Sequence, residues 1–133
     1  MTRVFADSFY FFALANPLDA AHRKALAYSR AQNVPLVLTT WVLTEVADGL
    51  GHSVQRGLFQ RILIELHAGR GHVIVPTTDA LWNKGVELYD ARSDKRWSLT
   101  DCISFVVMTD EGITDALTGD QHFIQAGFHA LLR

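Results

Sequence analysis

Short apolar runs alternate along the chain with longer segments whose apolar residues recur every three or four positions. Short runs suit buried strands, whereas the longer periodic segments are typical of amphipathic helices. The predicted strands cover residues 4–6, 34–38, 72–75 and 113–117, with a candidate edge strand near 129–132. The predicted helices cover residues 8–14, 20–32, 39–50, 55–68, 78–91, 101–108 and 120–126.

Side chains that can cap a helix precede several of the periodic segments. Thr39 or Thr40 can cap the third helix, because a threonine hydroxyl accepts a hydrogen bond from a backbone N–H of the first turn. Ser98 or Thr100 is expected to cap the strongly apolar helix in the same way. We interpret the polar residues 110–112, which follow that helix, as a solvated turn.

Strands that alternate with helices predict an α/β protein with a parallel sheet between two layers of helices. The chain has no internal repeat, low-complexity segment or linker, so residues 1–133 are expected to form a single domain. In sheets of this kind ligands bind beyond the carboxyl ends of the strands. Candidate functional residues should therefore be sought directly after the strands.

Composition narrows the class of protein. Of the 133 residues, 49% are apolar, which excludes a disordered chain, and the net charge of −2 argues against a general nucleic-acid coating protein. Cys102 is the only cysteine, so no internal disulfide can form. No apolar run approaches the roughly 18 residues that a membrane span requires. We expect a cytoplasmic protein without a membrane-spanning segment.

Four acidic residues lie within apolar runs or at their ends: Asp7, Glu45, Asp101 and Asp120. A carboxylate in such a setting carries a large desolvation penalty unless a positive group meets it. Mg²⁺ and Mn²⁺ prefer oxygen ligands, and a cage of carboxylates suits the hydrolysis of phosphodiester bonds. The pattern predicts that the fold gathers the four acids around one or two metal ions that activate a water molecule.

Other interpretations of the acids fit less well. Any one of them could be a simple cap or turn residue, and Asp101 could be only a first-turn acid favoured by the helix dipole. A receiver domain would need paired acids after the first strand and a lysine after the fifth, and no lysine follows Lys95. A haloacid-dehalogenase-type phosphatase would need two aspartates separated by one residue, where this chain has Asp7, Ser8 and Phe9.

The four acids and their surroundings resemble the PIN-domain family, and within it the VapC-type ribonuclease toxins of toxin–antitoxin pairs. The resemblance extends from residue 4 to about residue 130, and its motifs are VFADSFYFFALANPLDAAH, LVLTTWVLTEVADGL, DKRWSLTDCISFVVM and DALTGDQHFIQAGF. It implies a three-layer α/β/α PIN-like domain with a central parallel sheet of about five strands. It also implies that the four acids are catalytic metal ligands, with Mg²⁺ or Mn²⁺ as cofactor and RNA as substrate. A small antitoxin protein and a homodimer are the implied partners, and whether Asp115 joins the metal site is left open.

Several further residues are candidates for roles around the acids. Ser8 could bind a substrate phosphate or a metal-bound water, and Thr118 and Thr100 could play similar supporting roles. The basic residues Arg92, Lys95 and Arg96 could face RNA or simply belong to a solvated loop.

His122 lies next to the predicted site, and we interpret it as a structural residue rather than a base. The other histidines show no spacing typical of metal ligands: His22, His52, His67, His72 and His129.

Two alternative functions fit the same residues. A nuclease of this fold could mature RNA without any antitoxin, and a protein of this fold could bind RNA or a partner without cutting. The retention of all four acids favours cleavage over binding alone.

Overall fold

The computed structural model of the protein describes residues 2–31, 34–51, 55–69 and 71–133. Its parallel strands form one sheet in the order β3-β2-β1-β4-β5. The strands are β1 (Val4–Ala6), β2 (Leu36–Thr39), β3 (Val73–Val75), β4 (Asp115–Leu117) and β5 (His129–Ala130). This arrangement confirms the predicted α/β class and its PIN-like sheet of five strands.

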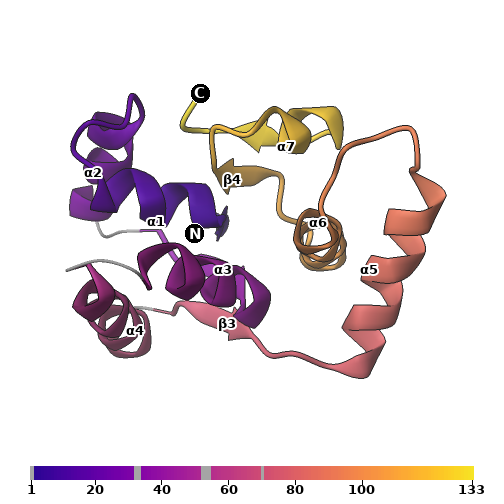
Figure 1. Cartoon of the computed structure of the whole chain (residues 1–133), viewed down its shortest axis with the longest axis horizontal. Helices are drawn as coiled ribbons and strands as arrows, with labels where there is room; N and C mark the ends of the chain where they lie inside the picture. Colours follow the sequence, from indigo (N-terminus) through magenta and orange to yellow (C-terminus); the bar gives the residue numbers. More distant parts are fainter. Residues whose placement is uncertain (1, 32–33, 52–54, 70) are drawn as a thin grey trace.

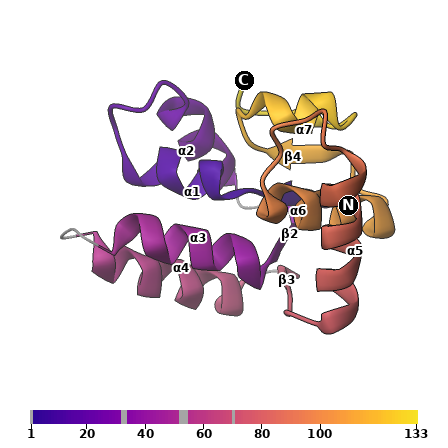
Figure 2. The same ribbon diagram turned by 45° about the vertical axis from the view of Figure 1, so that its right-hand side comes forward.

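Helices cover the sheet from both sides. Figures 1 and 2 show α1 to α4 grouped on one side of the strands, with α5 and α6 on the other. The helices are α1 (Ser8–Ala15), α2 (His22–Ala31), α3 (Thr40–Leu50), α4 (Arg56–Ala68), α5 (Asp79–Ala91), α6 (Leu99–Glu111) and α7 (Gln121–Gln125). Each helix has one apolar face and the sheet has two, and these faces are buried when helices pack on both sides of the sheet. The three-layer architecture follows.

The core covers both faces of the sheet, with buried residues from α1 and α3 on one face and from α6 on the other. Phe5 of β1 and Ile103 and Met108 of α6 are fully buried, as is Phe123 of α7. Gly85 of α5 lets this helix approach α6 closely, because a Cβ atom at Gly85 would collide with the side chain of Ile103. The described part of the chain contains no helix that is both long and apolar enough to cross a membrane.

An aromatic cluster joins the beginning of α6 to α7. The ring of Phe105 lies edge-on to Trp97 and to Phe123, with centroid separations of 5.0 Å in both pairs. The indole N–H of Trp97 donates a hydrogen bond of 3.0 Å to Gln125 Oε1. These contacts fix the segment before α6 against α7, and both carry residues of the site described below.

Two predicted boundaries differ from the structure around α6. The helix begins at Leu99 and continues to Glu111, so Asp110 and Glu111 form its last turn instead of a separate solvated turn. Ion pairs hold this last turn: Asp110 with Lys84 at 3.2 Å and Glu111 with Arg3 at 3.0 Å. Gly112, with a φ of 67°, ends the helix in the left-handed conformation that favours glycine.

Candidate active site

The four acids reach one edge of the sheet from separate parts of the chain. Asp7 directly follows β1, and Asp120 lies three residues after the end of β4. Glu45 lies within α3, which begins as soon as β2 ends, and Asp101 lies in the first turn of α6. Because the strands are parallel, their carboxyl ends meet at one edge, as the sequence predicted.

A pocket of about 340 Å³ opens at this edge and is lined by all four acids. Its lining consists of Asp7, Ser8, Phe9, Phe12, Glu45, Arg96, Ser98, Asp101, Asp120 and His122. Among the residues that the structure describes, Arg96 is the only arginine or lysine in this lining. We call this space the acidic pocket. Its carboxylate oxygens are the donor type that a hard divalent cation prefers.

Asp7 is the most buried of the four acids, with an exposed fraction of 6%. Burial is the main cause that raises the pKa of its carboxyl group from 3.8 to about 7, and the charges of Asp101 and Glu45 raise it further. Thr118 Oγ1 opposes this rise, because it donates a hydrogen bond of 2.8 Å to Asp7 Oδ2. Thr118 is itself fully buried and does not line the acidic pocket, so it contacts Asp7 from behind, and its role toward the substrate stays a prediction.

Glu45, on α3, also lines the acidic pocket. Burial raises the pKa of its side chain, and the charge of Asp101 raises it further. A hydrogen bond with the side chain of Ser8 opposes this effect. Ser8 therefore contacts a predicted metal ligand.

Asp101 is both a helix-capping residue and a residue of the acidic pocket. Its Oδ2 atom accepts a hydrogen bond of 3.1 Å from the Ser98 backbone N–H, and the Asp101 N–H donates to Ser98 Oγ at 3.0 Å. This reciprocal capping box fixes the side chain at the start of α6. Burial raises the pKa of Asp101, while the bonds from Ser98 and His122 lower it. The capping role suggested from the sequence thus coexists with a place in the site.

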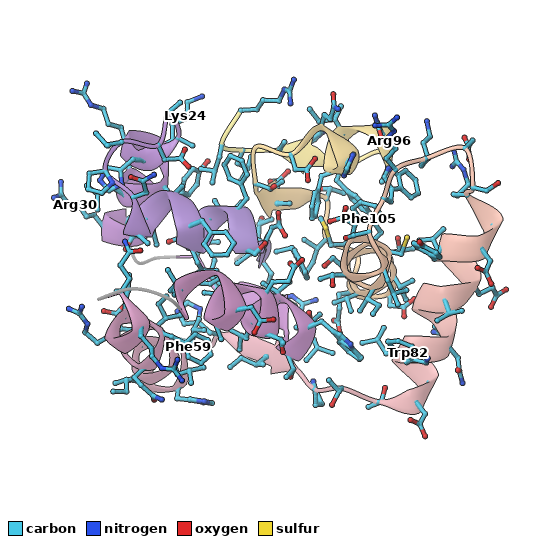
Figure 3. The ribbon with its side chains drawn as sticks, viewed as in Figure 1. Lys24, Arg30, Phe59, Trp82, Arg96 and Phe105 are labelled. Atoms are coloured by element: carbon cyan, nitrogen blue, oxygen red, sulfur yellow. The ribbon has the colours of Figure 1, made fainter. Side chains whose placement is uncertain are left out.

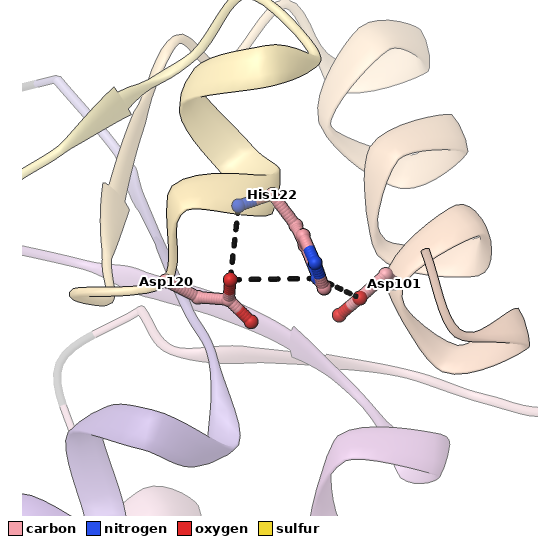
Figure 4. Close-up of side chains that lie close together, drawn as sticks. All are labelled: Asp101, Asp120 and His122. Carbon is pink, nitrogen blue, oxygen red and sulfur yellow. Dashed lines mark hydrogen bonds and ion pairs between the residues drawn. The ribbon is translucent and has the colours of Figure 1, made fainter. Parts of the chain in front are cut away.

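His122 lies between two of the acids, as Figure 4 shows. Its Nδ1 atom lies 3.1 Å from Asp101 Oδ2 and 3.4 Å from Asp120 Oδ1. The His122 backbone N–H also donates a hydrogen bond of 2.9 Å to Asp120 Oδ1, which caps α7. The His122 ring and backbone N–H therefore contact one oxygen of each aspartate, the ring at Asp101 and the N–H at Asp120.

Asp101 and Asp120 each keep one carboxylate oxygen that can bind a cation. Asp101 Oδ1 and Asp120 Oδ2 have no hydrogen-bond partner among the described residues. Asp101, Asp120 and His122 each offer a ligand atom, and these atoms lie within 4.8 Å of one another. The arrangement leaves carboxylate oxygens facing the same pocket, where a cation could bind them.

His122 has closer contacts with the acids than its sequence position indicated. We interpreted it as a structural residue next to the site, and the structure adds that it lies in the first turn of α7 and contacts two of the acids. Its position two residues after Asp120 was the available signal. Phe9 and Phe12 also line the pocket.

Other candidate residues lie outside the acidic pocket. Asp115 begins β4 and so lies at the amino end of this strand, away from the carboxyl ends where the acidic pocket opens. Its Oδ1 atom is 2.9 Å from His129 Nδ1. Thr100 lies in the first turn of α6 but does not line the pocket. Lys95 also lies outside the lining, and His52 falls outside the described residues.

Arg92 is held by neighbours in its own loop. Its guanidinium group donates hydrogen bonds of 2.9 and 3.0 Å to Asp94 and lies over the Trp97 ring, 5.1 Å from the centroid. Of the three basic residues predicted to bind substrate, the structure therefore places only Arg96 at the acidic pocket.

The chain is similar in fold to solved structures of other proteins. VapC20 of Mycobacterium tuberculosis, described as a sarcin–ricin loop cleaving toxin, matches with a TM-score of 0.82 and 23% identity over 94% of this chain and 95% of its own. FitAcB from Neisseria gonorrhoeae matches with a TM-score of 0.67 and 14% identity over 96% of this chain and 95% of its own. No protein-family model matches the chain, and no curated protein does either. The chain therefore has the PIN-like α/β/α fold that the VapC-type resemblance implied, and it shares this fold with the VapC20 toxin.

Proposed function

We propose that this protein is a divalent-metal-dependent endoribonuclease and the toxin of a toxin–antitoxin pair. The observation that carries the proposal is the acidic pocket, in which four carboxylates from separate segments line one space at the carboxyl edge of a parallel sheet. The fold shared with VapC20, a toxin that cleaves the sarcin–ricin loop, supports RNA as the substrate class.

The residues of the acidic pocket fit Mg²⁺ or Mn²⁺. Burial and mutual repulsion raise the pKa values of Asp7, Glu45 and Asp101, so their ionised forms are disfavoured unless a positive charge compensates them. Asp7, Glu45, Asp101 and Asp120 would hold the ion. When bound, the ion would supply the positive charge that activates water and stabilises charge on a phosphate under attack.

The protein's own groups do the positioning. Thr118 and Ser8 hold Asp7 and Glu45 through their hydroxyl groups. Ser98 and His122 hold Asp101, and the N-cap geometry of α7 holds Asp120. Arg96 offers a cation at the rim for a substrate phosphate. Fixed carboxylates reduce the reorganisation that catalysis would otherwise require.

A groove on the other side of α1 suits an antitoxin segment. It has a volume of about 330 Å³ and is lined by residues of α1, α2 and α4, among them Tyr10, Phe11 and Ile62. An amphipathic helix of the partner would place its apolar face there. Co-purification of the chain from its native operon should recover this partner, and recovery of the free chain alone would contradict the toxin role.

Cleavage of RNA by the purified chain tests the proposed activity. We expect single-stranded RNA to be cut when Mg²⁺ or Mn²⁺ is present and to stay intact when a chelator removes the metal. Intact RNA under both conditions would favour a protein that binds without cutting.

The homodimer, the single domain and the cytoplasmic location stay predictions. Light scattering after gel filtration measures whether the protein is a dimer.

A further inference from the structure

A second cleft lies beside the acidic pocket, where α5 ends and the segment leading to α6 begins. It has a volume of about 430 Å³, and Tyr89, Lys95 and Arg96 contribute to its lining. The buried side chains of Trp97 and Cys102 also border it. A cleft of this volume can take a group of the size of one nucleotide.

Arg96 connects this cleft to the acidic pocket, because it lines both spaces. Figure 3 places Arg96 close to α7, the helix that carries His122. A strand of RNA whose phosphate lies among the four acids would therefore continue past Arg96 into the neighbouring cleft.

The basic side chains of the cleft differ in whether they are free to bind a phosphate. Arg92 is committed to Asp94 and to the Trp97 ring. In contrast, neither Lys95 nor Arg96 forms an ion pair with a carboxylate of the described residues. Asp90 also lines the cleft and would repel a phosphate from its own side. These charges favour a phosphate on Lys95 and Arg96.

Tyr89 supplies an aromatic surface next to these cations. Its side chain on α5 is 48% exposed, although it is large and mostly apolar. Aromatic side chains in a groove with cations stack on the bases of single-stranded nucleic acids with little dependence on sequence. With a net charge of −2, the chain also needs local groups to attract RNA.

We propose that this cleft is a subsite for one nucleotide of single-stranded RNA adjoining the cleavage site. The base of that nucleotide stacks on Tyr89, and its phosphate contacts Arg96 and Lys95. The subsite deepens the proposed ribonuclease function and rests on it. Arg92 shapes the loop and does not contact the RNA.

Binding of a short, fluorescein-labelled single-stranded RNA to the full chain tests the base contact. Ca²⁺ replaces Mg²⁺ to neutralise the acids, and a gel run afterwards confirms that the RNA is intact. Tyr89→Ala should weaken binding about 10-fold, whereas Tyr89→Phe should keep it, because stacking needs only the ring. Tyr28→Ala is the matched control, since Tyr28 is an exposed tyrosine of α2.

The salt dependence of binding tests the phosphate contact. Arg96→Ala should reduce the slope of log affinity against log salt by about 0.7, the value for one phosphate contact of a single strand. Arg96→Lys should restore the slope, because it restores the charge. Arg30→Ala should leave it unchanged, since Arg30 lies at the opposite end of the molecule in Figure 3.

Photocrosslinking with RNA that contains 5-iodouridine locates the contact independently, and the crosslink is expected at Tyr89. The subsite is overturned if RNA binds to the wild type but Tyr89→Ala and Tyr28→Ala retain equal affinity. In that case the ribonuclease proposal stands, provided that the wild type cuts RNA with Mg²⁺. A wild-type chain that neither binds nor cuts RNA overturns both proposals.

Discussion

Thr118 Oγ1 donates a buried hydrogen bond of 2.8 Å to Asp7 Oδ2. Thr118 follows β4 and Asp7 follows β1, so this bond links the carboxyl ends of two strands that are 111 residues apart in sequence. The same hydroxyl accepts a hydrogen bond of 3.1 Å from the Asp120 backbone N–H. One threonine thus fixes the relative positions of two of the four acids. Its burial means that no water can replace it without rearrangement.

Thr118→Val should therefore weaken both stability and RNA cleavage. The valine keeps the shape but leaves the buried Asp7 carboxylate without its donor, which should cost about 1–3 kcal/mol of unfolding free energy at pH 8. Thr118→Ser keeps the hydroxyl and should retain most of both properties. Urea unfolding without metal gives the first quantity, and an RNA cleavage assay gives the second. Equal stability of the valine and serine variants would contradict this role.

The free energy of unfolding of the metal-free protein should fall as the pH rises from about 4 to above 7. Asp7 has a folded-state pKa of about 7 against an ordinary 3.8, so the folded state binds this proton more tightly than the unfolded state. The resulting stability is fully present below pH 3.8 and is lost as the pH rises through about 7. At about 1.4 kcal/mol per pKa unit, the loss is on the order of 4 kcal/mol.

Urea unfolding at several pH values in the presence of a chelator measures this loss. Asp7→Asn should remove most of the pH dependence, because asparagine does not titrate in this range. Asp115→Asn is the control, since Asp115 lies at the amino end of β4 beside His129. A wild-type free energy of unfolding that stays flat or rises between about pH 4 and 8 would show that Asp7 is not a desolvated acid.

His122→Ala should lower metal affinity by roughly 10- to 100-fold, the usual effect of removing a group that orients metal ligands. The ring contacts Asp101 Oδ2 at 3.1 Å and lies 3.4 Å from Asp120 Oδ1, so its loss removes a neighbour of both carboxylates, although the Ser98 and His122 backbone N–H bonds to them remain. Titration calorimetry with Mn²⁺ measures the affinity. His129→Ala removes the other histidine–aspartate pair, with Asp115, and should leave Mn²⁺ binding unchanged. Equal effects of the two substitutions would exclude a specific role for His122.

Gly85→Ala should destabilise the contact between α5 and α6 by about 1–3 kcal/mol, the usual cost of inserting a methyl group into a packed core. The new Cβ atom would collide with the Ile103 side chain. The same change in an Ile103→Ala background should cost little, because the colliding atoms are absent. Gly57→Ala in α4 meets no neighbouring atom and should stabilise the protein through helix propensity. Thermal unfolding of the four variants tests this coupling.

Much of the fold and the set of acids could be predicted because both depend on local patterns. Apolar runs and helical periodicity located the strands and helices that the structure describes, since parallel strands buried on both faces read as short apolar runs. Asp7 and Asp120 could be placed because each follows a strand. The capping box around Asp101 was predictable from Ser98, which precedes it by three residues.

The remaining features depend on packing between distant segments. Nothing local to His122 shows that its ring meets Asp101, because the contact requires α7 to pack on the start of α6. The aromatic cluster around Phe105 produces that packing, with partners at Trp97 and Phe123. The helical character of Asp110 and Glu111 was likewise missed, because their ion-pair partners lie far away in the sequence.

The central claim, that the acidic pocket is a metal-dependent centre for RNA cleavage, is tested most directly by three purified variants. Asp7→Asn and Asp101→Asn each remove a carboxylate from the pocket, whereas Asp115→Asn removes one that lies outside it. With Mn²⁺ or Mg²⁺ present, we expect RNA cleavage by the wild type and by Asp115→Asn, and none above background by the other two. Full activity of both Asp7→Asn and Asp101→Asn would contradict the claim.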